Sequence, residues 1–282
     1  MKHPNDQILF SKVFLIGEYS ACQYGRGILI CHAPTFKFQL SHTYPQDALM
    51  EKVTKEFPVL KHYGLQISAP HKDLGGFGQS SATFRAIANV LNEWGVIHPT
   101  SINEWYEWYL QFTWPTKKGL QPSGLDFIAQ TVEGCQFIDR DKDMLQPCNW
   151  LVEHFGIVIA HMKHKVTTHQ HLASISSQNS LFQPLDQYTH NAYHAIQTKN
   201  PTDLLHALEQ FQTTIRTLGL EHPNTLECIQ QLKKLPNILH ARGCGALGAD
   251  VILILTPKDQ CQIVAKSIQN MSYFKHIYTP FC

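Results

Sequence analysis

A glycine-rich segment between an expected strand and an expected helix constrains this chain more than any other feature. It reads Gly75-Gly76-Phe77-Gly78-Gln79-Ser80-Ser81-Ala82. The apolar run over 65–69 predicts a strand before it, and apolar residues at helical spacing over 80–94 predict an amphipathic helix after it. Glycine permits a tight turn and close approach to a ligand, and the free N–H groups of a helix start favour an anion. The segment predicts a phosphate-binding turn; the alternative is a plain turn capped by a serine.

This segment differs from two common nucleotide-binding loops. No Gly-Lys-Ser/Thr follows it, as a Walker A loop requires, and its glycines lack the G-x-G-x-x-G spacing of dinucleotide-binding folds. Ser80 and Ser81 add hydroxyl groups suited to phosphate or Mg²⁺.

Length and charge narrow the class of protein. The chain has 282 residues, enough for one large domain or two smaller ones, and its net charge of +1 gives no basic surplus for nucleic acid. No stretch of about 18 apolar residues predicts a membrane span, and the polar start does not resemble a signal peptide. We therefore expect a cytoplasmic protein with a small-molecule partner and neither nucleic acid nor membrane. The eight cysteines form no C-x-x-C pair, which favours reduced thiols.

The pattern along the chain predicts an α+β protein in two domains, residues 1–150 and 151–282. The first half has expected strands over 10–19, 27–31, 35–40, 65–69 and 135–139, and helices over 80–94, from the capping box at Ser101 and over 124–132. The second half has expected strands over 156–160, 250–255 and 274–278, and helices over 184–199, 201–218, 222–235 and 258–270.

Four segments, taken in order, carry a family resemblance. They are Ser11-Lys12-Val13-Phe14-Leu15-Ile16-Gly17-Glu18-Tyr19-Ser20, then Gly76 to Ala82, then Pro122-Ser123-Gly124-Leu125-Asp126, and Gly243-Cys244-Gly245-Ala246-Leu247-Gly248-Ala249-Asp250. They resemble the GHMP kinase motifs K-x-x-L-x-G-E-[HY] and G-L-G-S-S-A-A, the P-S-G-x-D motif of the mevalonate kinase branch, and a glycine-rich motif near the C-terminus. The resemblance covers nearly the whole chain.

The resemblance implies a fold, a reaction and a set of ligands. The fold would combine an N-terminal domain like domain 2 of ribosomal protein S5 with a ferredoxin-like C-terminal domain, and the active site would lie between them. The reaction would transfer the γ-phosphoryl group of ATP to a hydroxyl of mevalonate, with Mg²⁺. The implied ATP-binding residues are Gly75, Gly76, Gly78, Gln79, Ser80 and Ser81, with Ser80 also the metal ligand. The implied substrate-binding residues are Glu18, Tyr19, Ser20, Ser123, Gly124, Thr167, Thr168, Gly243, Gly245 and Ala246.

Two residues are the catalytic candidates within this resemblance. Asp126 follows a Ser-Gly turn near a helix start and would act as the base for the substrate hydroxyl. Lys12 would keep Asp126 ionised and stabilise charge on the transferred group. Outside the family context, Asp126 would be an ordinary helix N-terminal charge and Lys12 a solvated lysine of an edge strand.

Departures from the motifs keep other functions open. Gln79 replaces a serine, and the place of the family's metal-binding glutamate, about eleven residues before Asp126, is Pro115. Tyr19 and Asp250 are similar to residues of phosphomevalonate kinases. The alternatives are a phosphomevalonate kinase, a lyase of the diphosphomevalonate decarboxylase type, which shares the fold, and a non-catalytic metabolite sensor.

Two further patterns suggest other interpretations. The aromatic residues Trp105, Tyr106, Trp108 and Tyr109 lie at helical spacing, which indicates core or a dimer face, so an interaction protein or a homodimer is possible. The histidines at 161, 164, 169 and 171 lack the H-E-x-x-H spacing of a zinc site, and we do not expect one.

Overall fold

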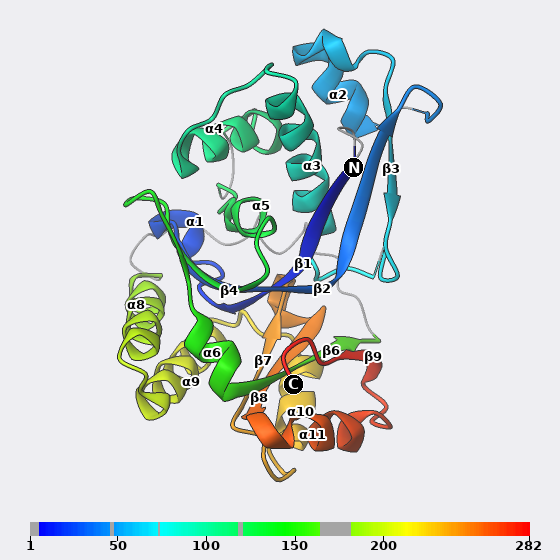
Figure 1. The fold of residues 1–282 in the computed structure, drawn as a ribbon. Coiled ribbons are helices and arrows are strands. Elements are labelled where there is room, and N and C mark those ends of the chain that lie inside the picture. Colours follow the sequence, from blue (N-terminus) through cyan, green and yellow to red (C-terminus); the bar gives the residue numbers. More distant parts are fainter. Residues whose placement is uncertain (1–5, 46–47, 73, 118–120, 164–181) are drawn as a thin grey trace.

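The computed structural model describes residues 6–45, 48–72, 74–117, 121–163 and 182–282. It contains two antiparallel sheets with helices packed around them (Figure 1). The mixed α and β composition confirms the expected α+β class.

The first sheet is organised around one long strand. Its strands are β1 (Asp6–Ile16), β2 (Arg26–Ser41), β3 (Gly64–Ser68), β4 (Gly134–Asp139) and β5 (Met144–Pro147). The order is β1-β2-β4-β5, and β3 pairs with the second half of β2. The sequence predicts two strands where β2 runs unbroken, because Pro34 interrupts the apolar pattern. Pro34 lies where the β1–β2 register shifts between Leu9 and Ser11, so its missing N–H is tolerated there.

Most helices of the first half cover one face of this sheet, and the last one, over 149–154, packs in the core on the other face, toward the second sheet. They are α1 (Ala21–Tyr24), α2 (Ala48–Glu56), α3 (Gln79–Glu93), α4 (Ile102–Thr113), α5 (Leu125–Ala129) and, after β5, α6 (Asn149–His154). Ser101 caps α4 as predicted, since its Oγ accepts from the Glu104 N–H at 3.1 Å. Tyr106, Trp108 and Tyr109 of α4 are buried in a core cluster, so their spacing reflects core packing. The sequence analysis missed α1, α2, α6 and β5, which are all short.

The second sheet has the ferredoxin-like topology. Its strands are β6 (Phe155–Met162), β7 (His240–Cys244), β8 (Val251–Pro257) and β9 (Phe274–Tyr278), in the order β7-β8-β6-β9. Helices α8 (Gln183–Gln197), α9 (Pro201–Thr217) and α10 (Pro223–Leu232) separate β6 from β7, and α11 (Cys261–Ile268) separates β8 from β9. This β-α-β-β-α-β sequence matches the expected C-terminal fold. The strand β7 was not predicted, because the polar residues His240 and Arg242 interrupt the apolar run that a buried strand usually has.

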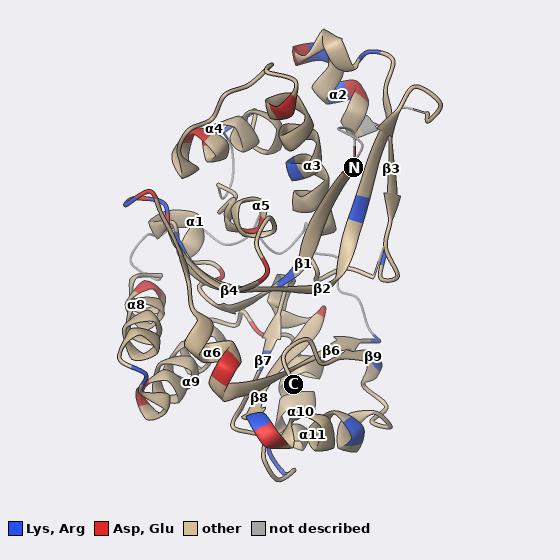
Figure 2. Cartoon of the chain, in the orientation of Figure 1, with Lys and Arg blue, Asp and Glu red and all other residues tan. Residues whose placement is uncertain are grey.

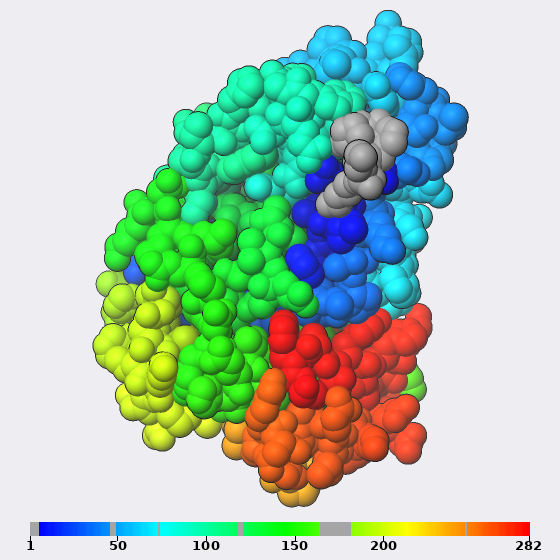
Figure 3. Space-filling model, in the orientation of Figure 1, coloured from blue at the N-terminus to red at the C-terminus, as the bar shows by residue number. Residues whose placement is uncertain are grey.

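One hydrophobic cluster joins the two sheets. It includes Leu9 and Phe137 of the first sheet together with Ile157 and Leu253 of the second. Figure 3 shows the C-terminal segment in red lying directly beside the first strands in blue. The chain passes from one sheet to the other through α6, close to residue 150; two domains with a boundary there remain a prediction.

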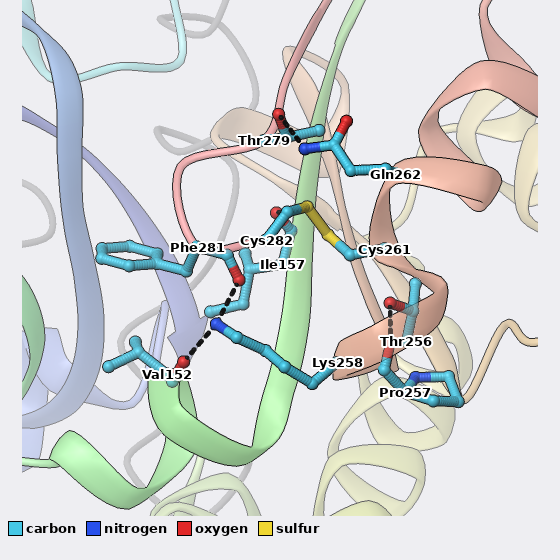
Figure 4. The surroundings of a disulfide bond; sticks show 10 residues. All are labelled: Val152, Ile157, Thr256, Pro257, Lys258, Cys261, Gln262, Thr279, Phe281 and Cys282. Atoms are coloured by element: carbon cyan, nitrogen blue, oxygen red, sulfur yellow. Dashed lines mark hydrogen bonds between the residues drawn. A yellow bond between two sulfur atoms is a disulfide. The ribbon is translucent and has the colours of Figure 1, made fainter.

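The C-terminus is attached to the second sheet by a disulfide bond. Cys282 is bonded to Cys261 at the start of α11, with 5.3 Å between their Cα atoms. Lys258 donates to the Val152 and Phe281 carbonyls, each at 2.7 Å (Figure 4). The expectation of eight reduced thiols is therefore wrong for this pair, and the other six cysteines are free. Spacing alone did not indicate this pair, because the partners lie 21 residues apart.

The charged side chains are spread over both halves of the fold. Lysine, arginine, aspartate and glutamate are scattered over the ribbon without a large region of one sign in this view (Figure 2). In the described part of the chain, no helix has the length and apolar character needed to cross a membrane.

Candidate active site

The glycine-rich turn opens α3 without a side-chain cap. Gly75, Gly76 and Gly78 all have positive φ angles of 84°, 75° and 80°. Gly78 is the N-cap residue, no side chain caps the helix and no acidic residue occupies its first turn. The alternative of a serine-capped turn is therefore not what the structure shows. A helix start left open in this way has backbone N–H groups and a positive partial charge available to a phosphate.

The two serines of the turn have different surroundings. Ser80 is exposed in the first turn of α3, whereas Ser81 is buried. An exposed hydroxyl beside an anion-binding helix start can reach a bound phosphate or its metal ion. Ser80 is thus the more suitable of the two for the predicted metal contact.

Lys12 and Asp126 form the ion pair that the resemblance implies. Lys12 Nζ lies 2.7 Å from Asp126 Oδ2, and the lysine side chain is only 8% exposed. Burial by itself would lower the pKa of Lys12, but the neighbouring Asp126 carboxylate more than offsets this, and the pKa is raised. Asp126 Oδ1 has no hydrogen-bond partner among the described residues. One carboxylate oxygen is therefore held by Lys12, and the other is buried with an unused acceptor position.

The glycine-rich turn lies directly against this ion pair. A Cβ at Gly78 would come within 2.8 Å of Lys12 Cε. The Lys12 N–H donates to the Phe77 carbonyl at 3.1 Å. The start of α3, the lysine and the aspartate are therefore adjacent in space.

The C-terminal glycine-rich segment reaches the same turn from the second sheet. A Cβ at Gly76 would lie 2.8 Å from Asp250 Cβ, and one at Gly245 would lie 2.5 Å from Asp250 Oδ2. Gly243 is packed as tightly, since a Cβ there would meet the Gly248 carbonyl oxygen at 2.2 Å. Ala246 belongs to the short 3₁₀ turn Ala246–Gly248 that follows. The first, second and fourth sequence segments are therefore adjacent in space.

Glu18 is engaged by an arginine that the sequence analysis did not identify. Arg242 Nη2 donates to Glu18 Oε2 at 2.7 Å, and Arg242 Nη1 donates to the Leu15 carbonyl at 2.5 Å. Burial opposes the charge of Arg242, but the Glu18 carboxylate raises the pKa of the arginine. Cys244 also donates to β1, at the Phe14 carbonyl. These contacts tie β7 to β1 beside the active-site lysine, and they occupy a carboxylate that was predicted to bind substrate.

Tyr19 likewise bridges two segments. Its hydroxyl donates to the Leu220 carbonyl at 3.4 Å and accepts from the Leu247 N–H at 3.3 Å. Burial raises the pKa of Tyr19 to about 12, so the hydroxyl stays protonated at neutral pH. The tyrosine thus connects the first sequence segment to the C-terminal glycine-rich segment.

The remaining predicted substrate residues differ in their access to the site. Ser20 is fully buried and its hydroxyl donates to the Gly17 carbonyl. Ser123 and Gly124 immediately precede α5, and Gly124 has a φ of 69° and is covered by the Tyr106 ring. Thr167 and Thr168 lie outside the described residues.

Arg140 is a buried cation between α1 and α4 that the sequence analysis did not identify. Its Nη2 donates to the Ala21 carbonyl at 3.1 Å, and its guanidinium lies over the Tyr106 ring at 3.9 Å. Its Nε and Nη1 have no hydrogen-bond partner in the described part of the chain. Burial raises the pKa of Cys22 to about 11, with Arg140 opposing that shift and Asp126 adding to it. No sequence motif surrounds Arg140, so no signal indicated it.

Candidate metal ligands are sparse around the start of α3. Within the described ranges, no group of three or more histidine, cysteine, aspartate or glutamate side chains could hold a metal ion. His161 is bonded to the Leu74 carbonyl at 2.8 Å, and the histidines at 164, 169 and 171 lie outside the described residues. Pro115 follows the end of α4, in place of a carboxylate.

The comparisons with known proteins come from structure alone. No family model matches the sequence, and no curated protein matches it. L. major mevalonate kinase, solved in complex with R-mevalonate, is 17% identical with a TM-score of 0.71, over 97% of this chain and 94% of that one. Streptococcus pneumoniae phosphomevalonate kinase, in complex with phosphomevalonate and AMPPNP, is 13% identical with a TM-score of 0.72, over 97% and 99% of the two chains.

A third similar structure is that of a galactokinase. Lactococcus lactis galactokinase, complexed with galactose, is 13% identical with a TM-score of 0.72, over 97% of this chain and 92% of that one. Identities this low establish the fold and leave the activity and its substrate open. The chain therefore has the two-sheet α+β fold of the GHMP kinases and is structurally similar to mevalonate kinase.

Proposed function

We propose that the protein is an ATP-dependent kinase that transfers the γ-phosphoryl group of ATP to a hydroxyl of mevalonate. The observation that carries this proposal is the Lys12–Asp126 ion pair of 2.7 Å beside the uncapped start of α3. A phosphate-binding helix start needs neither a base nor a buried lysine to hold nucleotide. Their presence together supports phosphoryl transfer over simple binding.

Three groups of the protein take part in the proposed step. The Asp126 carboxylate accepts the proton of the acceptor hydroxyl while the hydroxyl oxygen bonds to the γ-phosphorus of ATP, and the bond from the γ-phosphorus to the β-phosphate oxygen breaks to release ADP. Lys12 offsets negative charge on the transferred group while its pairing holds the Asp126 carboxylate in place. The N–H groups at the start of α3 would bind the phosphates of ATP.

The site could hold Mg²⁺ with a single protein ligand. The exposed Ser80 hydroxyl lies in the first turn of α3, where the phosphates would bind. Mg²⁺ commonly keeps several waters and takes phosphate oxygens, so one hydroxyl ligand suffices. The ion would neutralise phosphate charge during transfer.

Arg140 supports an acceptor that carries a negative charge. Its contacts include the Tyr106 ring and the Ala21 carbonyl, and none of the ion pairs among the described residues includes it. An anionic group on the acceptor would compensate a buried cation, whereas a neutral sugar would not. Mevalonate has a carboxylate, so this observation favours mevalonate over galactose.

Phosphomevalonate kinase is the second candidate. Tyr19 and Asp250 are similar to residues of those enzymes; Tyr19 lies at the contact between the first and last sequence segments, and Asp250 at the contact between the second and the last. A non-catalytic sensor is less well supported, because binding alone gives no reason for the Lys12–Asp126 pair.

An acceptor screen coupled to ADP release tests the proposal. The purified protein with MgATP is offered mevalonate, phosphomevalonate and galactose in turn. The proposal expects the highest kcat/KM with mevalonate. The highest value with phosphomevalonate would select the second candidate, and tight ATP binding without turnover on any acceptor would select the sensor.

A further inference from the structure

The buried amide of Gln130 lies where three parts of the candidate active site meet. Gln130 follows α5, one helical turn beyond Asp126, and its N–H donates to the Asp126 carbonyl at 3.3 Å. Its own carbonyl accepts from the Phe10 N–H of β1 at 2.9 Å. The residue is fully buried. Its backbone therefore joins the segment of Asp126 to the strand of Lys12.

The side chain extends the connection to the phosphate-binding turn. Gln130 Nε2 donates to the Phe10 carbonyl at 2.9 Å and to the Gly78 carbonyl at 3.2 Å, with the Phe77 carbonyl at 3.5 Å. Gly78 is the N-cap residue of α3. One amide group thus spans β1 and the first residue of the anion-binding helix start.

The surrounding groups fix the orientation of this amide. The carbonyl oxygens of Phe10, Phe77 and Gly78 surround the position of Nε2. A flipped amide would put its oxygen against those acceptors. Only a donor with two N–H groups serves at this point, and glutamine has them.

We propose that Gln130 is a positioning residue that holds the phosphate-binding turn in register with Lys12 and Asp126. It touches no substrate, and it acts through the Gly78 carbonyl on the backbone that would bind ATP phosphates. The inference rests on the proposed use of ATP, but it does not depend on which acceptor is phosphorylated.

The chain offers a matched control for the loss of a buried amide. Gln136 of β4 is also buried, and its Nε2 donates to a single carbonyl, that of Glu133 at 3.2 Å. Neither Gln136 nor Glu133 belongs to the candidate site. Gln136→Met removes a similar donor from the same sheet without contacting the turn.

The test compares nucleotide affinities, which need no acceptor. The dissociation constants of MgATP and of adenosine are measured by calorimetry for the native protein, Gln130→Met, Gln130→Glu and Gln136→Met. Thermal unfolding of each is recorded in parallel. We expect Gln130→Met to weaken MgATP on the order of 10-fold, as for the loss of a buried hydrogen bond at the binding turn. Adenosine affinity should change less than twofold, because adenosine has no phosphate.

The glutamate variant sharpens the test. At neutral pH its carboxylate would face three carbonyl oxygens, so Gln130→Glu should weaken MgATP more than Gln130→Met does. Gln136→Met should leave the ratio of the two affinities at the native value, even if its melting temperature falls as far as that of Gln130→Met. If Gln130→Met does not fold, Gln130→Asn replaces it, which keeps the amide but shortens its reach.

Each other outcome overturns a defined claim. A native ratio of MgATP to adenosine affinity in folded Gln130 variants would show that the amide only stabilises the fold. A native protein that binds no MgATP would overturn the proposed function and this inference together. A native protein that binds MgATP but phosphorylates nothing would overturn only the proposed reaction.

Discussion

Gly76 of the phosphate-binding turn lies against Asp250 of the C-terminal glycine-rich segment, so closely that a Cβ at Gly76 would come within 2.8 Å of Asp250 Cβ. The two residues are far apart in the chain and belong to different halves of the fold. Their contact places the turn between the two sheets, next to the Lys12–Asp126 pair. The account of function depends on this meeting of segments.

The first prediction concerns the backbone at Gly78. Gly78→Val should weaken ATP binding strongly, because the residue has a φ of 80° and its Cβ would be 2.8 Å from Lys12 Cε. Gly219→Val is the control, since Gly219 has a φ of 70° with nothing within 4 Å of its Cβ position. Both variants should lose about 1–2 kcal/mol of stability from backbone strain. Equal ATP affinities in the two folded variants would show that the turn has no part in nucleotide binding.

The second prediction concerns magnesium. Ser80→Ala should raise the Mg²⁺ concentration needed for half-maximal activity more than it changes acceptor affinity, because the hydroxyl is the protein ligand we place on the ion. Ser101→Ala is the comparison, since Ser101 is the actual cap of α4 and its loss should cost about 1 kcal/mol of stability. An Mg²⁺ titration unshifted in Ser80→Ala, with a stability loss like that of Ser101→Ala, would remove Ser80 from metal binding.

The third prediction is a loss of stability in mild acid. Burial lowers the pKa of His32 to about 4 and that of His240 to about 3. In the unfolded chain their pKa is about 6.5, so below that pH the unfolded state binds protons that the folded state does not. The free energy of unfolding should therefore fall as pH drops from 6.5 toward 4, by up to about 1.4 kcal/mol per pH unit for each histidine.

Urea unfolding between pH 7.5 and 4.5 checks this slope. His240→Leu should flatten it by one proton, while substitution of the exposed His98 by leucine should leave it as in the native protein. The same slope in His240→Leu and the native protein would show that His240 does not titrate with unfolding.

The fourth prediction concerns the C-terminal disulfide. The Cys261–Cys282 bond closes a loop across a sequence separation of 21 residues. Reduction by dithiothreitol should lower the free energy of unfolding by about 3 kcal/mol, chiefly through the gain in freedom of the unfolded chain. Cys282→Ser should have the stability of the reduced native protein, both with and without dithiothreitol. A native protein as stable with reductant as without it would mean that the bond does not contribute.

Parts of this molecule were predictable from sequence because they have local causes. The strand–turn–helix around Gly78 follows from glycine spacing and an amphipathic repeat, and the start of α4 follows from the cap at Ser101. The Lys12–Asp126 pairing was available only by resemblance, since 114 residues separate the two in the sequence. Arg140, Gln130 and Arg242 were missed because their roles depend on contacts made by the fold, and although Arg242 directly precedes the C-terminal glycine-rich motif, that motif does not indicate its partner Glu18.

The measurement that tests the account most directly is phosphoryl transfer from ATP to mevalonate. The native protein, Asp126→Asn and the exposed control Asp259→Asn are incubated with MgATP and mevalonate, and the phosphorylated product is followed by phosphorus NMR. The account predicts phosphorylated mevalonate and ADP in equal amounts from the native protein and Asp259→Asn. It predicts a rate lower by roughly 10² to 10⁴ in Asp126→Asn, with ATP affinity nearly unchanged. Near-native turnover in Asp126→Asn, or no phosphorylated mevalonate from the native protein, would contradict it.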